Sequence, residues 1–589
     1  MVYESSYETG RKPFTPDLQR GKWEKPTDFI FACCGLALKL DIFVISYWFF
    51  FDTRLFFILP YFFYMAIYMV PLLVIHSFMG QFSSSGFISA FRLSPFFKGM
   101  GYVSVFLSIA SLLFYSIFAI VPLVFILHSL RPTMPWSCEG LGNVGNLTTV
   151  NAISILANET DFDVLHMTEI HIPSVLFFKQ HFGSLGGGFI SEKDDFQFSW
   201  TIVGFSVMIW GIIACIFRYY SETAKFGKLL RYMIMTALAL LMMCLARFLF
   251  LPGALDGLTH YVKPHLDSTI NGSLVMMVVV LQAFGSGWGS VMSLSSFNNF
   301  KTNIMSYSWI IAFGQTLVYI LFGMVNFILQ HYFRAMNVDS LDLYAETNWV
   351  LYLSSASALA TLEWANLWTI LYYSMLLISS LIVMITQIFT VLTSLFDEFE
   401  FLREHKERVT YGLIGFLALC SLLFCTKHGI IFFSAVSLDA IFTYSAMHLL
   451  LILAVLWIYG RDRFQRDIEF MLGRPFASWK VFTLRFIAPL FLLNTLLFGL
   501  FASFMKHVYE STLVLYISLF LVIIPLLFIP GYGMYITYQN TGGSCNRFRR
   551  ACRPTDWYPQ EMENRQQYED VVGNSDLTHQ LYEVTEEVN

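Results

Sequence analysis

Charged residues are scarce in this sequence. Asp, Glu, Lys and Arg make up 13% of its 589 residues and hydrophobic residues make up 56%, whereas a soluble domain carries about 25% charged residues. Uncharged runs recur along the whole chain, and each is long enough to cross a bilayer, because one transmembrane helix needs about 20 apolar residues. The composition therefore excludes a soluble globular protein. It indicates an all-α, polytopic membrane protein whose surroundings are the lipid bilayer.

The sequence also lacks the motifs of several functional classes. It contains no His-Glu-x-x-His, Gly-x-Ser-x-Gly or phosphate-binding loop, so we expect it not to be an enzyme and to hold no resident cofactor. We expect no nucleic-acid partner either. Most of the nine cysteines lie in or beside apolar runs, where a free cysteine acts as a small apolar residue, so no disulfide framework is predicted.

The apolar runs predict about twelve transmembrane helices between residues 28 and 537. Their expected ranges are 28–51, 55–80, 99–130, 198–217, 226–250, 272–297, 305–332, 364–396, 409–425, 430–459, 479–504 and 512–537. Residues 1–27 are polar and lack the short apolar core of a signal peptide, so they form an N-terminal tail. The end of the chain turns acidic and rich in Gln and Asn, which predicts a disordered C-terminal tail over residues 538–589.

The positions of Lys and Arg set the expected orientation. Short loops containing Arg92 and Arg218 fall on one side of the predicted bundle, and the positive-inside rule makes that side cytoplasmic. Both tails are then cytoplasmic, and the long loop 131–199 is extracellular. This loop contains glycosylation sequons at Asn146 and Asn158, which can be used only outside the cytoplasm. We therefore expect a glycosylated, multi-pass protein of the plasma membrane.

The first apolar run contains two charges near its middle, Lys39 and Asp41. A charge at this depth costs at least about 2.5–3.5 kcal/mol, so it is usually paired, faces a cavity or has a function. Residues two apart point to different sides of a regular helix, but these two could meet around an unwound segment. Residues 35–48 are therefore a candidate for a broken helix near the middle of the membrane.

The sixth predicted helix carries an interruption of its own. Gly285, Gly287 and Gly289 alternate with Ser286 and Trp288. Such glycines could serve close helix packing, or they could mark a discontinuous helix whose freed backbone groups line a cavity. The charges at similar depth in the first helix favour the cavity. Interruptions in the first and sixth helices are typical of an inverted-repeat transporter with its site at the membrane midplane.

Eight short motifs occur in order along the predicted membrane domain. They are Gly35-Leu36-Ala37, Pro60-Tyr61, Gly80-Gln81, Phe97-Lys98-Gly99-Met100-Gly101-Tyr102, Pro135-Trp136-Ser137-Cys138, Leu251-Pro252-Gly253-Ala254-Leu255-Asp256-Gly257, Ser296-Phe297-Asn298-Asn299-Phe300 and Trp457-Ile458-Tyr459-Gly460-Arg461. Together they resemble the neurotransmitter:sodium symporter family. The resemblance implies a LeuT-like fold, with two inverted five-helix repeats, broken helices 1 and 6 and two extra helices. It also implies alternating-access transport of an amino acid or amine-like molecule, with sodium and chloride as coupling ions.

The resemblance assigns roles to single residues. Arg20 and Trp23 match the family's Arg-x-x-Trp before the first helix, and Asp397 matches the acidic residue at the inner end of the eighth. In the family these residues close the cytoplasmic side, and an exposed ion pair worth about 0–1 kcal/mol suits a gate that must open. Tyr115 and Trp288 match substrate-contacting aromatic residues, although ordinary apolar packing would also explain them. The other pocket residues that we predict, at the two breaks, are Ala37, Lys39, Asp41 and Gly285.

The sequence departs from the family at the ion sites and at the outer gate. Apolar residues replace the family's ion ligands and outer arginine, at Ile42, Ala283, Ile382, Val383 and Ile45. Sodium needs several hard oxygen ligands, and only the backbone carbonyls of Ala37 and Leu38 remain, which alone make a poor site. We therefore predict no metal site built from side chains. Sodium coupling, proton coupling and uncoupled transport all stay open.

Lys39 stands where the family's amino-acid transporters have a small residue and its monoamine transporters have Asp. Its ammonium could replace a bound sodium beside Asp41, select an anionic substrate, or be a structural charge satisfied by backbone carbonyls. The sequence thus predicts a symporter-like carrier for an amino acid or amine. The alternative is a family member that no longer transports and acts as a receptor, sensor or trafficking partner. The oligomeric state is left open.

Overall fold

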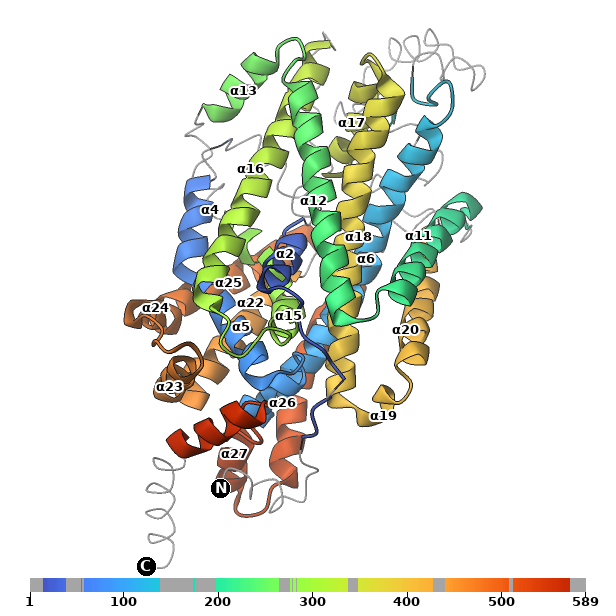
Figure 1. Ribbon diagram of the computed structural model, residues 1–589. Helices are drawn as coiled ribbons and strands as arrows, with labels where there is room; N and C mark the ends of the chain where they lie inside the picture. The colour runs from blue at the N-terminus through green and yellow to red at the C-terminus, as the bar shows by residue number, and fades with distance from the viewer. Residues whose placement is uncertain are drawn as a thin grey trace, which may run out of the picture.

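A computed structural model shows the chain as a bundle of long helices (Figure 1). The described residues are 14–17, 19–38, 55, 58–137, 173–174, 177, 198–263, 276–277, 279–281, 283–336, 348–426, 440–507 and 512–572. Within these ranges the only β pairing is an isolated bridge between Phe198 and Thr426. The all-α class that the composition predicts is confirmed.

Long helices make up most of the bundle. They are α5 (Val70–Ser83), α6 (Gly99–Ser129), α11 (Trp200–Tyr219), α12 (Thr223–Phe248), α16 (Ile304–Met336), α18 (Ala365–Glu398), α20 (Lys406–Ser421), α22 (Ala440–Ile452), α25 (Ala488–His507) and α26 (Thr512–Gln539). The shorter elements are α2 (Pro26–Leu36), α4 (Ile58–Tyr64), η2 (Met65–Met69), η3 (Ser89–Leu93), η4 (Pro95–Lys98), α13 (Ala254–Val262), η6 (Ala283–Trp288), α15 (Ser290–Ser295), α17 (Asn348–Ala360), α19 (Glu400–Arg403), η7 (Leu422–Cys425), η8 (Leu453–Gly460), α23 (Arg461–Leu472), α24 (Ser478–Phe482), η9 (Thr483–Ile487) and α27 (Ser544–Cys552).

Nine helical segments of the described chain are long and apolar enough to cross a membrane. The predicted first and sixth helices, which contain undescribed residues, and the predicted twelfth, which is α26, are not among these nine. The remaining nine predictions each fall on one of the nine segments. The boundaries differ by a few residues, and the predicted tenth helix, 430–459, is described only from residue 440.

The helices α6 and α18 lie side by side at the centre of the bundle and run antiparallel (Figure 1). Ser380 Oγ of α18 donates to the backbone oxygen of Phe118 at 3.2 Å, and Gln387 Nε2 donates to Ser111 Oγ at 3.1 Å. Moving seven residues forward along α18 therefore moves seven residues back along α6. Such interhelical hydrogen bonds suit a membrane interior, where no water competes for the polar groups.

The predicted break in the sixth helix is present in the backbone. Within η6, Phe284 and Gly285 have φ values of 58° and 57°, and Gly289, just before α15, has φ 71°. These left-handed values interrupt an α-helix, and a non-glycine residue such as Phe284 seldom adopts them. One of the elements that contact η6 is α2, which ends at Leu36. The residues that would continue the first helix, 39–54, lie outside the described residues.

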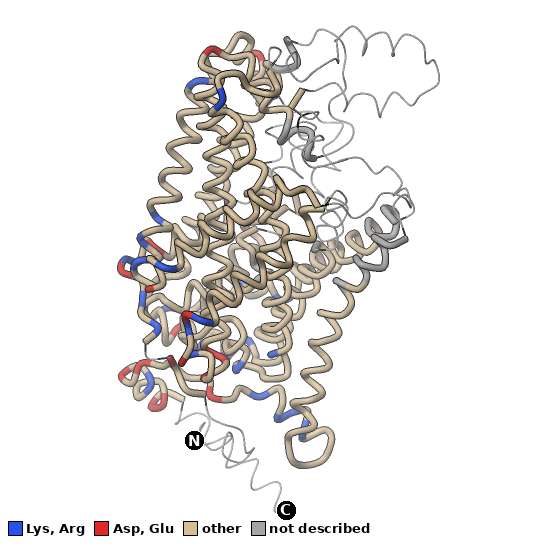
Figure 2. The backbone as a smooth tube through the Cα atoms, turned by 90° about the vertical axis from the view of Figure 1, so that its right-hand side faces the viewer, with Lys and Arg blue, Asp and Glu red and all other residues tan. Residues whose placement is uncertain are grey.

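Charged residues are most numerous toward one end of the bundle, drawn at the bottom of Figure 2, with long uncharged stretches above it and a smaller group of charges at the top. We call the end at the bottom of Figure 2 the charged end. It holds the N-terminal segment 14–25, the end of α18 and α27 (Figure 1). The arrangement agrees with the Lys and Arg loops that the sequence places on one side of the membrane.

The expected disorder from residue 538 onward is wrong for residues 538–572. This stretch contains α27 and a further helical segment at 562–572. Trp557 and Tyr568 are only 3% and 4% exposed. They pack on Phe82 at the end of α5, with ring centroids 5.1 and 5.3 Å away. The average composition is polar, but these two buried aromatic side chains help to anchor the segment. Residues 573–589 lie outside the described residues.

Candidate functional site

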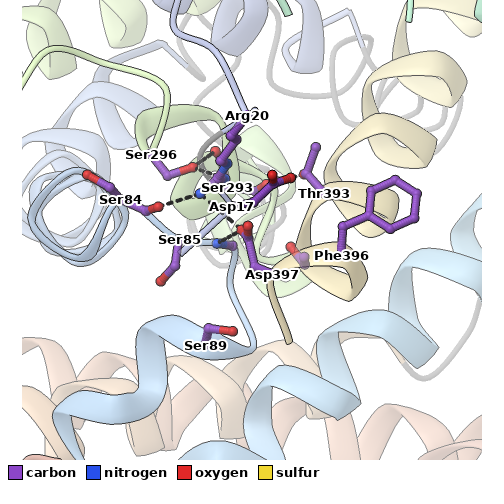
Figure 3. Close-up of polar contacts among 12 residues, drawn as sticks. Asp17, Arg20, Ser84, Ser85, Ser89, Ser293, Ser296, Thr393, Phe396 and Asp397 are labelled. Carbon is purple, nitrogen blue, oxygen red and sulfur yellow. Dashed lines mark hydrogen bonds and ion pairs between the residues drawn. The ribbon is translucent and has the colours of Figure 1, made fainter. Parts of the chain in front are cut away.

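Arg20 and Asp397 meet at the charged end (Figure 3). Arg20 Nη1 lies 3.0 Å from Asp397 Oδ2. The same guanidinium donates to the backbone oxygen of Ser84 at 2.6 Å and to the hydroxyl of Ser296. Asp397 in turn accepts the backbone N–H of Gly86 at 2.6 Å. One polar cluster thus joins the N-terminal segment, the end of α5, the end of α15 and the end of α18.

Burial makes the loss of either partner of this ion pair more costly than the sequence led us to expect. The side chains of Arg20 and Asp397 are only 10% and 3% exposed. Burial lowers the pKa of the Arg20 guanidinium, and the nearby charges of Asp397 and Asp17 oppose that shift. An exposed pair contributes about 0–1 kcal/mol, whereas removing one partner of a buried pair costs about 3–5 kcal/mol. The contact is therefore a buried ion pair and not a weak surface pair.

Trp23 forms an aromatic layer directly beside the ion pair. Its indole Nε1 donates to the backbone oxygen of Leu294 at 3.0 Å, and its ring lies 5.4 Å from that of Phe297, edge to face. The guanidinium carbon of Arg20 sits 4.3 Å from the centroid of the same Phe297 ring, within the range of a cation–π contact. Polar and aromatic contacts therefore close the same point of the bundle.

Further ion pairs hold the N-terminal segment on either side of Arg20. Asp17 Oδ2 lies 2.7 Å from Lys406 Nζ, and Asp28 Oδ1 lies 3.2 Å from Arg231 Nη1. Burial alone would raise the pKa of Asp17, but the hydrogen bond and charge of Lys406 bring it below its usual value. The N-terminal segment is thus attached to α20, and the start of α2 that follows it is attached to α12.

The structure describes part of the predicted substrate pocket. Ala37 and Tyr115 are fully buried, and Gly285 lies at the break of η6. Three predicted features fall outside the described residues: Lys39, Asp41 and the side chain of Trp288. The sequons at Asn146 and Asn158 do as well. The pocket and the glycosylation sites therefore stay predictions.

Two contacts at the helix break were not anticipated from the sequence. Ser104 Oγ of α6 donates to the backbone oxygen of Gly287 at 3.3 Å. The ring of Tyr444, on α22, packs so closely on Gly287 that a Cβ there would overlap it. Ser104 could have been found from the spacing of polar residues on α6. Tyr444 could not, because nothing local signals a contact between residues 157 positions apart.

Apolar side chains fill the positions where the family has ion ligands. Ala283, Ile382 and Val383 are fully buried. A Cβ built on Gly35 would lie 2.8 Å from Ile382 Cγ2, so this isoleucine packs directly against the backbone near the end of α2. Its methyl groups supply no oxygen to a hard cation. Nowhere in the described ranges do three or more His, Cys, Asp or Glu residues gather to hold a metal ion.

Comparison with known proteins places the chain in a family. The model of the Sodium:neurotransmitter symporter family matches residues 20–540. The chain belongs to this family. It is 25% identical to "Sodium- and chloride-dependent glycine transporter 1" of Xenopus laevis over 93% of this chain and 90% of that protein. It is 26% identical to "Sodium- and chloride-dependent glycine transporter 2" of Xenopus laevis over 80% of this chain and 63% of that protein.

Family membership confirms the resemblance that the eight motifs carry. This sodium:neurotransmitter symporter family member is a polytopic membrane protein of a transporter family and not of an enzyme family. The match begins at Arg20 and ends at Asn540, so it spans the Arg20–Asp397 cluster and the break at η6 and stops before the docked segment 553–572.

Proposed function

We propose that this protein carries a small amino acid or amine across the plasma membrane by alternating access, with both tails in the cytoplasm. The observation that carries the proposal is the Arg20–Asp397 cluster. It closes one end of a bundle that contains a broken helix. Its polar contacts link four separate elements, so their separation would open a path from that end. The printed names of the two relatives, both glycine transporters, support a substrate of glycine's class.

We further propose that the coupling of this transport does not depend on side-chain sodium ligands. The support is the apolar filling around Ile382 and Gly35. In this proposal the ammonium of Lys39 provides a fixed positive charge where relatives would bind an ion. Because this charge is part of the chain, no ion has to bind. For the same reason, it cannot couple transport to an ion gradient. Transport would then run down the gradient of the substrate itself or be coupled to another ion.

The test is uptake of radiolabelled glycine, larger amino acids and simple amines by cells that express the full chain. Uptake is measured in sodium chloride, with sodium replaced by N-methylglucamine, and with chloride replaced by gluconate, beside a Lys39→Gly variant. We expect saturable uptake that persists without sodium and is lost in the variant. Surface biotinylation controls for the amount of protein at the plasma membrane.

Two results would contradict these proposals. Uptake that requires sodium would show that the remaining backbone oxygens suffice for an ion site, and it would overturn the coupling proposal alone. No uptake in any buffer, with normal surface expression, would overturn the transport proposal for these substrates. It would favour a family member that serves as a receptor, sensor or trafficking partner.

A further inference from the structure

One face of α6 carries a line of polar groups through the middle of the membrane. Ser104, Ser108, Ser111 and Tyr115 are spaced i, i+4, i+7 and i+11, which places them on one side of a helix. The line starts at the helix break, where Ser104 Oγ donates to the backbone oxygen of Gly287 at 3.3 Å. It ends at Tyr115, the residue predicted to contact the substrate. The line therefore borders the predicted pocket along its length.

Gln387 of α18 joins this line at its middle. Its side-chain nitrogen donates to Ser111 Oγ at 3.1 Å, and the residue is fully buried. One turn nearer the charged end, the hydroxyls of Thr390 and Ser290 lie 3.3 Å apart, and Ser290 opens α15 directly after the helix break. Gln387 thus lies between the level of the break and the level of Tyr115, where a bound solute would lie.

The carboxamide oxygen of Gln387 has no hydrogen-bond partner among the described residues. The neighbouring Thr386 hydroxyl, also fully buried, has none within the same part of the chain. A carboxamide oxygen can accept two hydrogen bonds, and leaving a buried acceptor unpaired is unfavourable. A leucine would fill similar space without that cost. The Gln387 amide is thus oriented by one hydrogen bond, and its oxygen remains available. A hydrogen-bond donor on a ligand would satisfy that oxygen.

We propose that Gln387 determines substrate specificity by accepting a hydrogen bond from the side group of the substrate. The substrate class is then a small amino acid or amine whose side group carries an O–H or N–H donor, such as a hydroxyl or an amide. Aliphatic analogues of the same size are bound less well. A site built to pair a polar group rejects the analogue that lacks it, because its own polar atom is left unpaired. This inference rests on the proposed function and adds the chemistry of the side group.

The experiment compares isosteric pairs that differ only in the donor. Purified full-length protein in lipid nanodiscs is titrated with serine and 2-aminobutyrate, and with ethanolamine and n-propylamine. The shift of the unfolding temperature gives each apparent affinity. For the wild type we expect the hydroxyl member of at least one pair to bind about tenfold more tightly or better, the effect of one buried hydrogen bond. Gln387→Leu should abolish this preference while keeping the affinity for the aliphatic member.

Two variants serve as controls. Gln387→Glu keeps an acceptor oxygen and should retain the preference. Gln330→Leu removes another buried glutamine, whose side-chain nitrogen donates to Ser354 Oγ at 3.0 Å on α17, at the opposite end from the charged end (Figure 1). It should leave the preference unchanged. If Gln387→Leu does not fold, Gln387→Met, which has a similar shape and no carboxamide oxygen, takes its place in the comparison.

The possible failures are distinguishable. Equal wild-type affinity for both members of each pair would overturn this inference and leave the proposed function standing. If Gln387→Leu keeps the preference for the hydroxyl member, the inference is also overturned, because another residue must then accept the hydrogen bond. The proposed function would again stand. No binding of any of the four compounds to folded wild-type protein would contradict the proposed function, and this inference with it.

Discussion

In the proposed transport cycle, one buried ion pair, Arg20–Asp397, would hold the charged end closed. Backbone groups of Ser84 and Gly86 also hydrogen-bond to Arg20 and Asp397, so each of these two side chains has a further partner in this arrangement. Their desolvation has a cost, which the pair repays only while both partners are present. Loss of one partner should therefore be worse for the closed conformation than loss of both.

This argument gives a prediction about single residues. Asp397→Ala should weaken the closed conformation by about 3–5 kcal/mol, because the Arg20 charge stays buried and unpaired. Adding Arg20→Ala to that variant should recover part of the loss, as a double-mutant cycle would show. Closure is measured as the rate at which a membrane-impermeant thiol reagent reaches Ser293→Cys, a fully buried position next to the cluster, against the same chain without that cysteine.

The outcome that would contradict this prediction is strict additivity. If the two substitutions together accelerate labelling by the product of their single effects, Arg20 and Asp397 act independently, and the lock lies elsewhere in the cluster. Trp23→Phe is the informative companion variant. It removes the indole bond to the Leu294 carbonyl and shortens the buried ring that packs on Phe297, so it should cost at least about 1 kcal/mol, the net value of one hydrogen bond.

At the scale of elements, close helix approach depends on particular glycines. Gly80 of α5 faces α15 so closely that a Cβ would overlap the backbone oxygen of Met292. A backbone atom cannot move aside as a flexible side chain can. By contrast, Gly211 on α11 has no atom within 4 Å of a Cβ built on it. The two positions form a matched pair, since both are helical and only one is at a contact.

We expect the same substitution at these two positions to have opposite effects. Gly80→Ala should lower stability by at least about 1–3 kcal/mol through overpacking. Gly211→Ala should leave stability unchanged or raise it by about 0.5–1 kcal/mol, because alanine is the better helix former. The measurement is the thermal unfolding midpoint of each purified variant in the same detergent. Equal effects at the two positions would mean that α5 and α15 do not meet at Gly80.

The elements also show which features a sequence can predict. The break at η6 could be predicted because alternating glycines are a local signal, and the left-handed backbone of Phe284, Gly285 and Gly289 confirms it. The sequence alone shows that Ile382 stands where the family has an ion ligand. It could not show that Ile382 packs against Gly35. Gln387 went unnoticed for a similar reason. A glutamine inside an apolar run attracts notice only when the partner across the helix pair, Ser111, is known.

At the scale of the whole molecule, the segment after α27 folds back onto the charged end. Buried Asp467 of α23 accepts hydrogen bonds from Tyr568 Oη at 3.0 Å and from Trp557 Nε1 at 3.3 Å. Its other partners are Tyr459 and Arg466. The average composition did not predict this docking, because residues 553–572 are mostly polar. Their two buried aromatic side chains, Trp557 and Tyr568, contact residues that are distant in the sequence. Sequence reasoning therefore failed here while it succeeded for the membrane helices.

The docked segment also holds the N-terminal segment that carries Arg20. The backbone N–H of Phe14 donates to Asp556 Oδ2 at 3.2 Å, and Lys22 pairs with Glu561. These two contacts lie on either side of Arg20 along the chain. An opening movement that pulls Arg20 away from Asp397 would have to release them as well. In the proposed transport cycle, the C-terminal segment would thus add to the stability of the closed conformation.

Truncation tests this coupling between the two ends of the chain. Ending the chain after residue 552 removes both anchors of Asp467 and both contacts to the N-terminal segment, so labelling of Ser293→Cys by the impermeant reagent should become about tenfold faster or more. That change corresponds to about 1.4 kcal/mol, a modest value for two buried aromatic side chains. Ending the chain after residue 572 keeps every one of these contacts and is the matched control, which should label at the full-length rate.

Equal rates for the two truncations would show that the segment is docked without restraining the gate. A second contrary result is that the shorter chain labels slowly and becomes fast only when Asp397→Ala is added. That result would mean that the buried ion pair alone holds the charged end closed.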